Sequence, residues 1–366
     1  MTKKITTILL VIICLISAVS LVCVAENAES YHPSQELMCI SYRGDTALYE
    51  ANSEEAVLSA FSKGADFVSV NVRKSQEGTY VLCSETAEET AGVPLTEMLS
   101  LLNDNQVLIL DFDIELRDEI YALLINENAL GKAWLRIKDS ASEINGWLSD
   151  KPDVNVIGVT SSFNVFTVRS FVKKLNHLPA VQLQSKNYFN VMYGALCYSL
   201  YDSRVGTRAV APMYDPDMCG QRSDSEDGWN DLIKKNFSII ETNNIESLVA
   251  YKEQSRQLKE SLGAVLKRAE DINPEIYSIV SRENLADAIE NAQTILNGGL
   301  ASNDELQSAS STLQRAINNL TLSHGEDNQK GALNVTAGKV IAAVIMGIII
   351  LSAQIYTYKM QKRKKT

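Results

Sequence analysis

Charged side chains stand at the ends of several short apolar runs in this chain. Arg43 ends one such run, Asp111 and Asp113 end another, and Lys138 and Glu241 hold similar places. A guanidinium fork suits a phosphate or a carboxylate, so Arg43 is our main candidate for contact with an anion. In the simpler alternative, Arg43 pairs internally with one of the three acids and no ligand binds. Both alternatives require the ends of the runs to meet in space.

Eight apolar runs, alternating with segments of helical periodicity, would bring those ends together. The runs that begin at 107 and 155 are apolar nearly throughout, which suits strands covered on both faces. The alternation predicts an α/β fold with a parallel (β/α)8 barrel of the TIM type, and a doubly wound open sheet is the competing arrangement. The expected strands are Met38–Arg43, Asp66–Arg73, Val107–Asp113, Ala133–Lys138, Asn155–Thr160, Ala180–Ser185, Arg208–Tyr214 and Phe237–Thr242.

The segment from Ile40 to Glu85 carries a series of short motifs. Arg43-Gly44 ends the first run, Asn52-Ser53 begins a helix, and Gly64-Ala65-Asp66 leads into the second run. This series resembles the opening of the glycerophosphodiester phosphodiesterase family, and the resemblance extends over most of residues 38–252. It implies the barrel rather than the open sheet. Later segments that resemble the family are LILDFD, TSSFNVFTVRSFVKK and FSIIETNNIESLVAYK.

The side chains that perform the family's chemistry are replaced in this chain. Active members hold a divalent cation with carboxylates at the barrel mouth and use two His as general acid and base. By the resemblance, the two His positions are Tyr42 and Ser84, and the metal positions are Ser69, Asn71 and Asp111. Neither tyrosine nor serine titrates near neutral pH, and a hard cation prefers charged oxygens. The resemblance therefore predicts a barrel without catalytic residues and without a metal site.

Both ends of the chain carry apolar segments. The charged start followed by the run from Ile8 to Val24 predicts a signal peptide over residues 1–25, with an uncleaved anchor as the alternative. Residues 340–358 are uncharged and are about as long as the ~20 residues that span a bilayer. The basic tail, residues 359–366, should stay in the cytoplasm. We expect a single-pass protein of the cell membrane whose remaining residues lie outside the cell.

Between the barrel and the membrane, residues 253–321 have helical periodicity. Three apolar stripes, which begin at Leu258, Leu285 and Leu306, predict a small three-helix bundle. This block resembles the FIVAR-type helical module of Gram-positive surface proteins. Ser302 and Glu305 have the spacing of a capping box at the start of the third helix. Residues 322–339 are expected to be a linker.

Composition excludes some functions. The formal net charge of −11 argues against nucleic acid as a partner. The four cysteines after the expected signal peptide match no zinc pattern, and disulfides and buried free thiols are equally open to them. The three histidines are expected to be surface residues. The cysteines are Cys39, Cys83, Cys197 and Cys219, and the histidines are His32, His177 and His324.

We therefore expect a non-enzymatic surface protein, anchored to the membrane through its C-terminal helix, whose barrel binds a ligand or serves as a scaffold. The expected ligand is a cell-wall or glycerophosphate-containing molecule, and no cofactor is expected. In the alternative, the chain is an active phosphoric diester hydrolase that cleaves glycerophosphodiesters with a rearranged Ca²⁺ or Mg²⁺ site. Asp111, Asp113, Glu115 and Glu241 would supply that site. A barrel that is only a spacer is a third arrangement.

Overall fold

The computed structural model describes residues 36–83, 92–161, 165–175, 178–184, 208–210, 224–234 and 237–323. The expected signal peptide, transmembrane helix and basic tail lie outside the described residues, as do Ser84, Cys197, Cys219 and the three histidines. Within the described part, no helix combines the length and the apolar character that a membrane span requires. The described chain divides into two compact units, which are treated separately below. The first unit ends at Leu258 and also includes Asn297–Glu305, and the second comprises Lys259–Leu296 and continues from Leu306.

Eight parallel strands close into a barrel in the first unit. Each strand pairs with the next along the sheet, and β1 pairs with both β10 and β2, so the sheet closes on itself. The predicted barrel is confirmed, and the closure excludes the doubly wound open sheet. The barrel strands, in spatial order, are β1 (Met38–Tyr42), β2 (Phe67–Lys74), β5 (Val107–Asp111), β6 (Ala133–Ile137), β7 (Asn155–Ser161), β8 (Ala180–Gln184), β9 (Arg208–Val210) and β10 (Ile239–Thr242).

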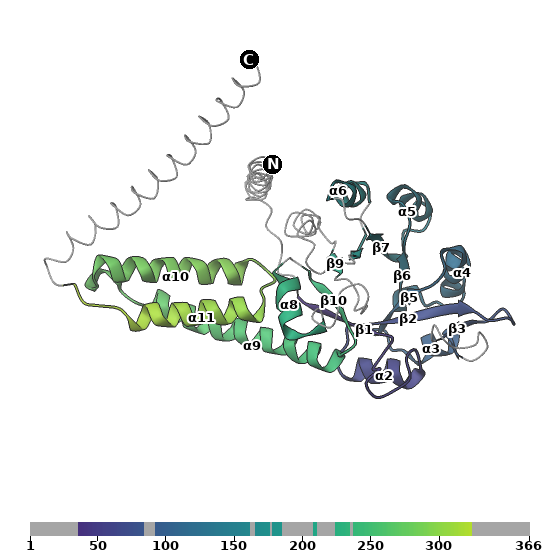
Figure 1. Ribbon diagram of the computed structural model, residues 1–366, viewed down its shortest axis with the longest axis horizontal. Coiled ribbons are helices and arrows are strands. Elements are labelled where there is room, and N and C mark those ends of the chain that lie inside the picture. Colours follow the sequence, from purple (N-terminus) through teal and green to yellow (C-terminus); the bar gives the residue numbers. More distant parts are fainter. Residues whose placement is uncertain are drawn as a thin grey trace, which may run out of the picture. The chain divides into compact units, whose positions relative to one another are not determined.

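Helices cover the outside of the strands, as Figure 1 shows for α4, α5 and α6. Local signals begin several of them. The Ser53 hydroxyl accepts the Ala56 N–H at the start of α2, and the Ser140 hydroxyl accepts the Glu143 N–H at the start of α5. A short antiparallel extension, β3 (Tyr80–Leu82) and β4 (Val93–Pro94), continues from β2. The helices around the barrel are α2 (Glu54–Ser62), α3 (Leu95–Leu101), α4 (Arg117–Asn126), α5 (Ala141–Leu148), α6 (Val165–Lys174) and α8 (Glu226–Ile233).

Alternation along the strands produces two apolar cores, because successive side chains of a strand point to opposite faces. The outward-facing residues, such as Val70, Leu110 and Leu135, are buried together with helix residues such as Leu124. The inward-facing residues fill the barrel, where the rings of Phe67 and Trp134 lie 4.7 Å apart. The buried members of this inner core are Ile40, Phe67, Ile109, Ile157, Ala180 and Ile239.

Three long helices follow the barrel: α9 (Ile245–Glu270), α10 (Ile279–Asn297) and α11 (Asn303–Asn318). In the second unit, each of the three predicted stripes contains buried residues, for example Leu262, Leu285 and Leu313. The side chains of Arg268 and Gln314 are hydrogen-bonded at 3.0 Å between α9 and α11. The helical periodicity of this region therefore correctly predicted its secondary structure and its buried faces.

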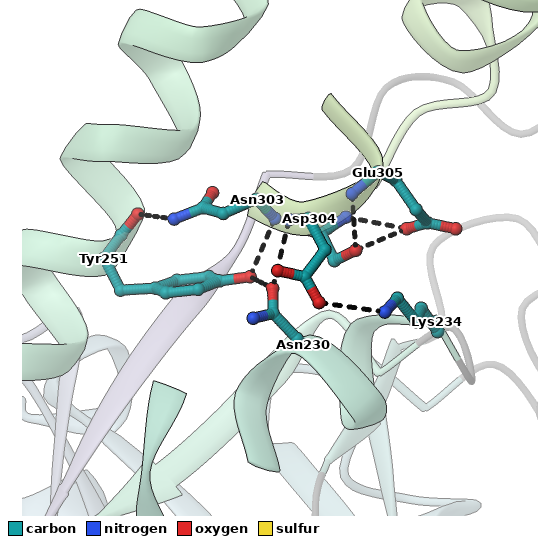
Figure 2. Close-up of polar contacts among 7 residues, drawn as sticks. Asn230, Lys234, Tyr251, Asn303, Asp304 and Glu305 are labelled. Atoms are coloured by element: carbon teal, nitrogen blue, oxygen red, sulfur yellow. Dashed lines mark hydrogen bonds and ion pairs between the residues drawn. The ribbon is translucent and has the colours of Figure 1, made fainter. Parts of the chain in front are cut away.

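The first turn of α11 belongs to the first unit, where Ser302 and Asn303 are buried and Asp304 is exposed; Figure 2 shows its polar contacts. The Tyr251 hydroxyl donates to Asn230 Oδ1 at 2.7 Å and accepts the backbone N–H of Asn303 at 3.0 Å. Lys234 forms an ion pair with Asp304 at 3.1 Å. Almost every polar group of this set has a partner. We call the set the α11 cap cluster; its members are Asn230, Lys234, Tyr251, Asn303 and Asp304.

The predicted capping box of α11 is confirmed (Figure 2). The backbone N–H of Ser302 donates to Glu305 Oε2 at 2.9 Å, and the N–H of Glu305 donates to the Ser302 hydroxyl at 3.3 Å. The two residues thus satisfy N–H groups that the helix itself leaves open. Ser302 is fully buried, so this cap is part of the packed interior of the first unit.

Candidate functional site

A buried arginine joins two carboxylates near the carboxyl ends of the barrel strands. Arg136 on β6 donates from Nη1 to Asp111 Oδ2 of β5 at 2.6 Å and from Nη2 to Glu241 Oε1 of β10 at 3.0 Å. The side chain of Glu241 is 0% exposed, that of Arg136 is 6% exposed and that of Asp111 is 28% exposed. We call these three residues the Arg136 triad.

Strand alternation places the triad inside the barrel. Trp134, Ile109 and Ile239 belong to the inner core, and the next inward position on each of their strands is Arg136, Asp111 or Glu241. The triad therefore forms a polar layer one step closer to the strand ends than the apolar inner core. In barrels of this type, the C-terminal end of the strands carries the functional residues.

Burial and charge act in opposite directions in the triad. Burial raises the pKa of Asp111 to about 6, although Arg136 opposes this change, and the charge of Glu241 raises the pKa further. Burial alone would lower the pKa of Arg136, but the two carboxylates outweigh it and raise the pKa above its ordinary value. Arg136 therefore stays charged, and the pKa of Asp111 is raised toward neutral pH.

Several buried polar atoms around the triad have no hydrogen-bond partner within the described part of the chain. In the triad itself these are Arg136 Nε and Glu241 Oε2. Asn71 Nδ2 on β2 and Gln182 Oε1 on β8 are also buried without a partner among the described residues. Buried polar atoms of folded proteins are nearly always paired, and an unpaired group in a dry interior is destabilising. The inside of the mouth is thus polar without being fully satisfied, as is common at functional sites.

The turn after β1 holds Arg43 and Gly44 in left-handed conformations, with φ of 60° and 87°. A Cβ on Gly44 would lie 2.6 Å from the carbonyl carbon of Ala56, so the close approach of α2 requires glycine here. The Arg43 N–H donates to the Ser69 carbonyl at 2.8 Å, and its guanidinium lies 4.5 Å above the Tyr42 ring. The Arg-Gly motif therefore has a structural reason in this chain.

Asn52 links the turn to β2 and to the segment after β3. Its Oδ1 accepts the Asn71 N–H and its Nδ2 donates to the Cys83 carbonyl, both at 2.9 Å. Ser69 is fully buried, and its hydroxyl donates to the Ser41 carbonyl at 3.5 Å. Asn71 lies beside Asp111 in the register of β2 with β5. Two of the three positions that the resemblance assigns to metal ligands are therefore neutral groups in the interior.

These residues do not fit the divalent cation that the resemblance implies for active members. Among the described residues, no three His, Cys, Asp or Glu side chains lie close enough together to hold a metal ion. Asp111 is the charged member of the Ser69, Asn71 and Asp111 set, and Arg136 Nη1 already lies 2.6 Å from its Oδ2. A cation would have to approach a guanidinium that the same carboxylate binds.

The structure brings Asp111 and Glu241 together through Arg136, places Arg43 nearby and places Asp113 and Lys138 at exposed positions. Asp113 is exposed after the end of β5 and pairs with Arg73 at 3.2 Å. Lys138 is exposed just beyond β6. The charge of Arg43 is close enough to Asp111 to lower the pKa of Asp111. Arg43 therefore lies near the triad at the barrel mouth.

A four-residue shift of the resemblance would place Glu115 rather than Asp111 at the acidic position of this strand, with Arg117 two residues later, but both lie beyond the end of β5. Glu115 is in the 3-10 turn Ile114–Leu116, and Arg117 begins α4, where its guanidinium lies 5.2 Å from the Trp147 ring. Asp111 is therefore the acid at the end of the strand.

Sequence analysis missed Arg136 and Gln182. The signal for Arg136 was present in the strand AWLRI, where Arg136 is the single charged residue and shares a face with Trp134. An arginine at an inward position of a covered strand needs a partner of opposite charge. Gln182 lies two residues after the inward-facing Ala180 on the same strand, so it also faces into the barrel, and it is 1% exposed.

No model of a known protein family matches the chain, and no curated protein matches it in sequence. Among solved structures it is similar to glycerophosphodiester phosphodiesterases. The enzyme from Thermotoga maritima has 16% identity and a TM-score of 0.44, with 60% of this chain and 99% of that chain covered. One from Parabacteroides distasonis has 12% identity and a TM-score of 0.48, with 61% and 90% covered.

An Oleispira antarctica phosphodiesterase, solved with its product sn-glycerol-3-phosphate, has 11% identity and a TM-score of 0.44. The match covers 60% of this chain and 96% of that chain. The closed barrel described above follows from strand pairing and does not depend on these likenesses.

Proposed function

We propose that this chain is a membrane-anchored extracellular protein whose barrel is a binding or scaffold module without hydrolytic activity. The signal peptide, the transmembrane helix and the FIVAR-like character of the helical unit enter this proposal from the sequence. The resemblance to glycerophosphodiester phosphodiesterases suggests a cell-wall or glycerophosphate-containing ligand, with Arg43, Lys138, Asp111, Asp113 and Glu241 as candidate contacts.

The observation that carries the absence of hydrolysis is the engagement of Asp111 and Glu241 by Arg136. A hydrolytic centre of this class needs a metal ion to neutralise the phosphoryl group, and a group that transfers a proton near neutral pH. The two acids at the strand ends instead form ion pairs with one fixed guanidinium, that of Arg136. Tyr42, Ser69 and Asn71 supply neither a charged ligand nor a group that titrates near neutral pH.

Hydrolysis of glycerophosphodiesters is the second candidate function, and one observation favours it. The pKa of Asp111 is raised to about 6, and its side chain is 28% exposed at the mouth. A carboxyl group that titrates near neutral pH is suited to general acid–base catalysis. In this alternative, Asp111 would transfer the proton and Asp113, Glu115 and Glu241 would rebuild the metal site.

The two functions are distinguished by an assay of the full-length protein, purified in detergent. The protein is incubated with glycerophosphocholine or glycerophosphoethanolamine in the presence of Mg²⁺, Ca²⁺ or Mn²⁺, and released sn-glycerol-3-phosphate is measured. We expect no release above that of the matched Asp111→Asn variant. Metal-dependent release that is lost in Asp111→Asn would establish the enzyme instead.

A further inference from the structure

The Arg136 triad resembles a metal centre in its layout, although its cation is a side chain. Two carboxylates from β5 and β10 point at one positive group inside the barrel. A Ca²⁺ ion contacts oxygens at ~2.3–2.6 Å, and Mg²⁺ is commonly held by one or two carboxylates with water in the other positions. The guanidinium nitrogens lie 2.6 and 3.0 Å from the carboxylate oxygens. The two acids are therefore arranged around a cation.

We propose that the Arg136 guanidinium is the resident cation of this site and excludes divalent metals from it. When only the charge of Arg136 is removed, Asp111 and Glu241 should become the ligands of a divalent-cation site. This inference rests on the proposed function, because both require the two acids to be closed to metal in the natural chain.

The charge balance supports this role. With Arg136 in place, the triad carries a formal charge of −1. The positive charge of Arg43 partly offsets this negative charge at Asp111. Without Arg136 the two acids carry −2, which one divalent ion neutralises. Two carboxylates that face the same dry space repel each other, so a bound cation would stabilise the altered site strongly.

The packing explains why a metal does not displace Arg136. Arg136 and Glu241 are almost completely buried, and Arg136 Nε and Glu241 Oε2 have no partner among the described residues. A displaced guanidinium would lose both of its carboxylates while it remained in the interior, which is highly unfavourable. Asn71, beside Asp111 in the strand register, would supply a neutral oxygen once the site is open.

The test compares the full-length protein with five variants in detergent, with Tm and isothermal titration as readouts against MgCl2, CaCl2 and MnCl2. We expect the natural chain and Arg136→Lys, which keeps the charge, to show no response to millimolar metal. Arg136→Met should gain about 5–10 °C in Tm at a metal concentration ~100-fold above its Kd. The gain should disappear in Asp111→Asn/Arg136→Met, which lacks one ligand.

Two outcomes overturn the inference: metal binding by the natural chain that is lost in Asp111→Asn, or a folded Arg136→Met variant that ignores all three ions. If Arg136→Met is unfolded without metal, recovery of its circular dichroism on addition of a divalent ion supports the inference. A lack of recovery overturns it when Asp111→Asn/Arg136→Met/Glu241→Gln, which buries no charge, does fold. The hydrolysis assay is independent of these readouts, so the failure of one proposal is distinguishable from the failure of the other.

Discussion

The first unit contains two polar clusters of different character, the α11 cap cluster around the buried Tyr251 hydroxyl and the Arg136 triad. In the α11 cap cluster, the Tyr251 hydroxyl both donates and accepts a hydrogen bond, and the backbone groups around it are satisfied. In the Arg136 triad, three charged groups meet, and Arg136 Nε and Glu241 Oε2 have no partner within the described residues. In the cap cluster, Asn303 Oδ1 also lacks a partner among the described residues, but the rest of the network is satisfied, and such a network stabilises one arrangement. An unsatisfied, charged network in the interior is destabilising.

The largest expected effect tests whether the triad is held together by its charge balance. Arg136→Met leaves two carboxylates without their counter-ion and should lower the free energy of unfolding by about 3–5 kcal/mol. Asp111→Asn/Arg136→Met/Glu241→Gln removes all three charges and should be much closer to the natural chain. Urea unfolding followed by circular dichroism measures both. Equal losses in the two variants would contradict the charge-balance argument.

A comparison of Gly44 with Gly78 separates the effect of backbone conformation from the effect of packing at the barrel mouth. Gly44 and Gly78 both have φ of 87°, but an added Cβ meets the Ala56 backbone at 2.6 Å in the first case and nothing within 4 Å in the second. Gly78→Ala should lose about 1 kcal/mol from the strained φ alone, and Gly44→Ala should lose at least about 2–3 kcal/mol. Similar Tm values for the two variants would show that α2 does not need this close approach.

The cap cluster is tested by removal of one hydroxyl. Tyr251→Phe leaves Asn230 Oδ1 and the Asn303 N–H with fewer partners in a buried place, and should cost about 1–3 kcal/mol. Tyr49→Phe, at an exposed position, is the matched control and should change the free energy of unfolding by less than about 0.5 kcal/mol. Chemical denaturation of the two variants compares them directly. An effect of Tyr251→Phe no larger than the control would remove the distinction between the clusters.

The smallest effect is a pH dependence that belongs to the triad. The folded pKa of Asp111 is about 6, above its ordinary value of 3.8, so the folded state binds this proton more tightly than the unfolded state. The cost of burying the Asp111 charge is therefore absent below about pH 4 and complete above about pH 6. We expect the Tm of the natural chain to fall relative to Asp111→Asn across this window. The effect should be on the order of 1 kcal/mol, because the side chain is 28% exposed and partly screened.

The same series of Tm measurements on the natural chain and Asp111→Asn also shows when this prediction fails. A difference in Tm that stays flat from pH 4 to pH 7 would show that Asp111 is ionised throughout. Asp113→Asn is the control, because Asp113 is exposed and pairs only at the surface with Arg73.

Much of the fold was predictable because its signals are local. The eight barrel strands were predicted in their correct order, since their apolar runs and the helices between them are visible over a few residues. The stripes around Leu262, Leu285 and Leu313 were predicted for the same reason, as was the capping box of Ser302 and Glu305. Strand ends were less certain. Asp113 was placed on β5, but the strand ends at Asp111 and Asp113 precedes a 3-10 turn.

The candidate site was predictable only in part. Asp111 and Glu241 were correctly placed near strand ends, and Lys138 was chosen as the basic residue of β6. The structure shows that the inward basic residue of this strand is Arg136, two positions earlier, while Lys138 is exposed. The alternation of β6 contained that information, but it required knowledge of which face of the strand points into the barrel.

The amino-acid sequence alone determined which segments become strands and helices and which faces they bury, because hydrophobic periodicity acts over a few residues. It also suggested, through the resemblance stated for residues 38–252, that Tyr42, Ser69 and Asn71 stand where active phosphodiesterases have catalytic or metal-binding side chains. Only the tertiary structure decided which charges meet. Arg136 is 25 residues from Asp111 and 105 residues from Glu241 in the sequence, and barrel closure brings the three together. Ion pairs depend on distances of a few ångströms in a dry interior, and no local pattern specifies such distances.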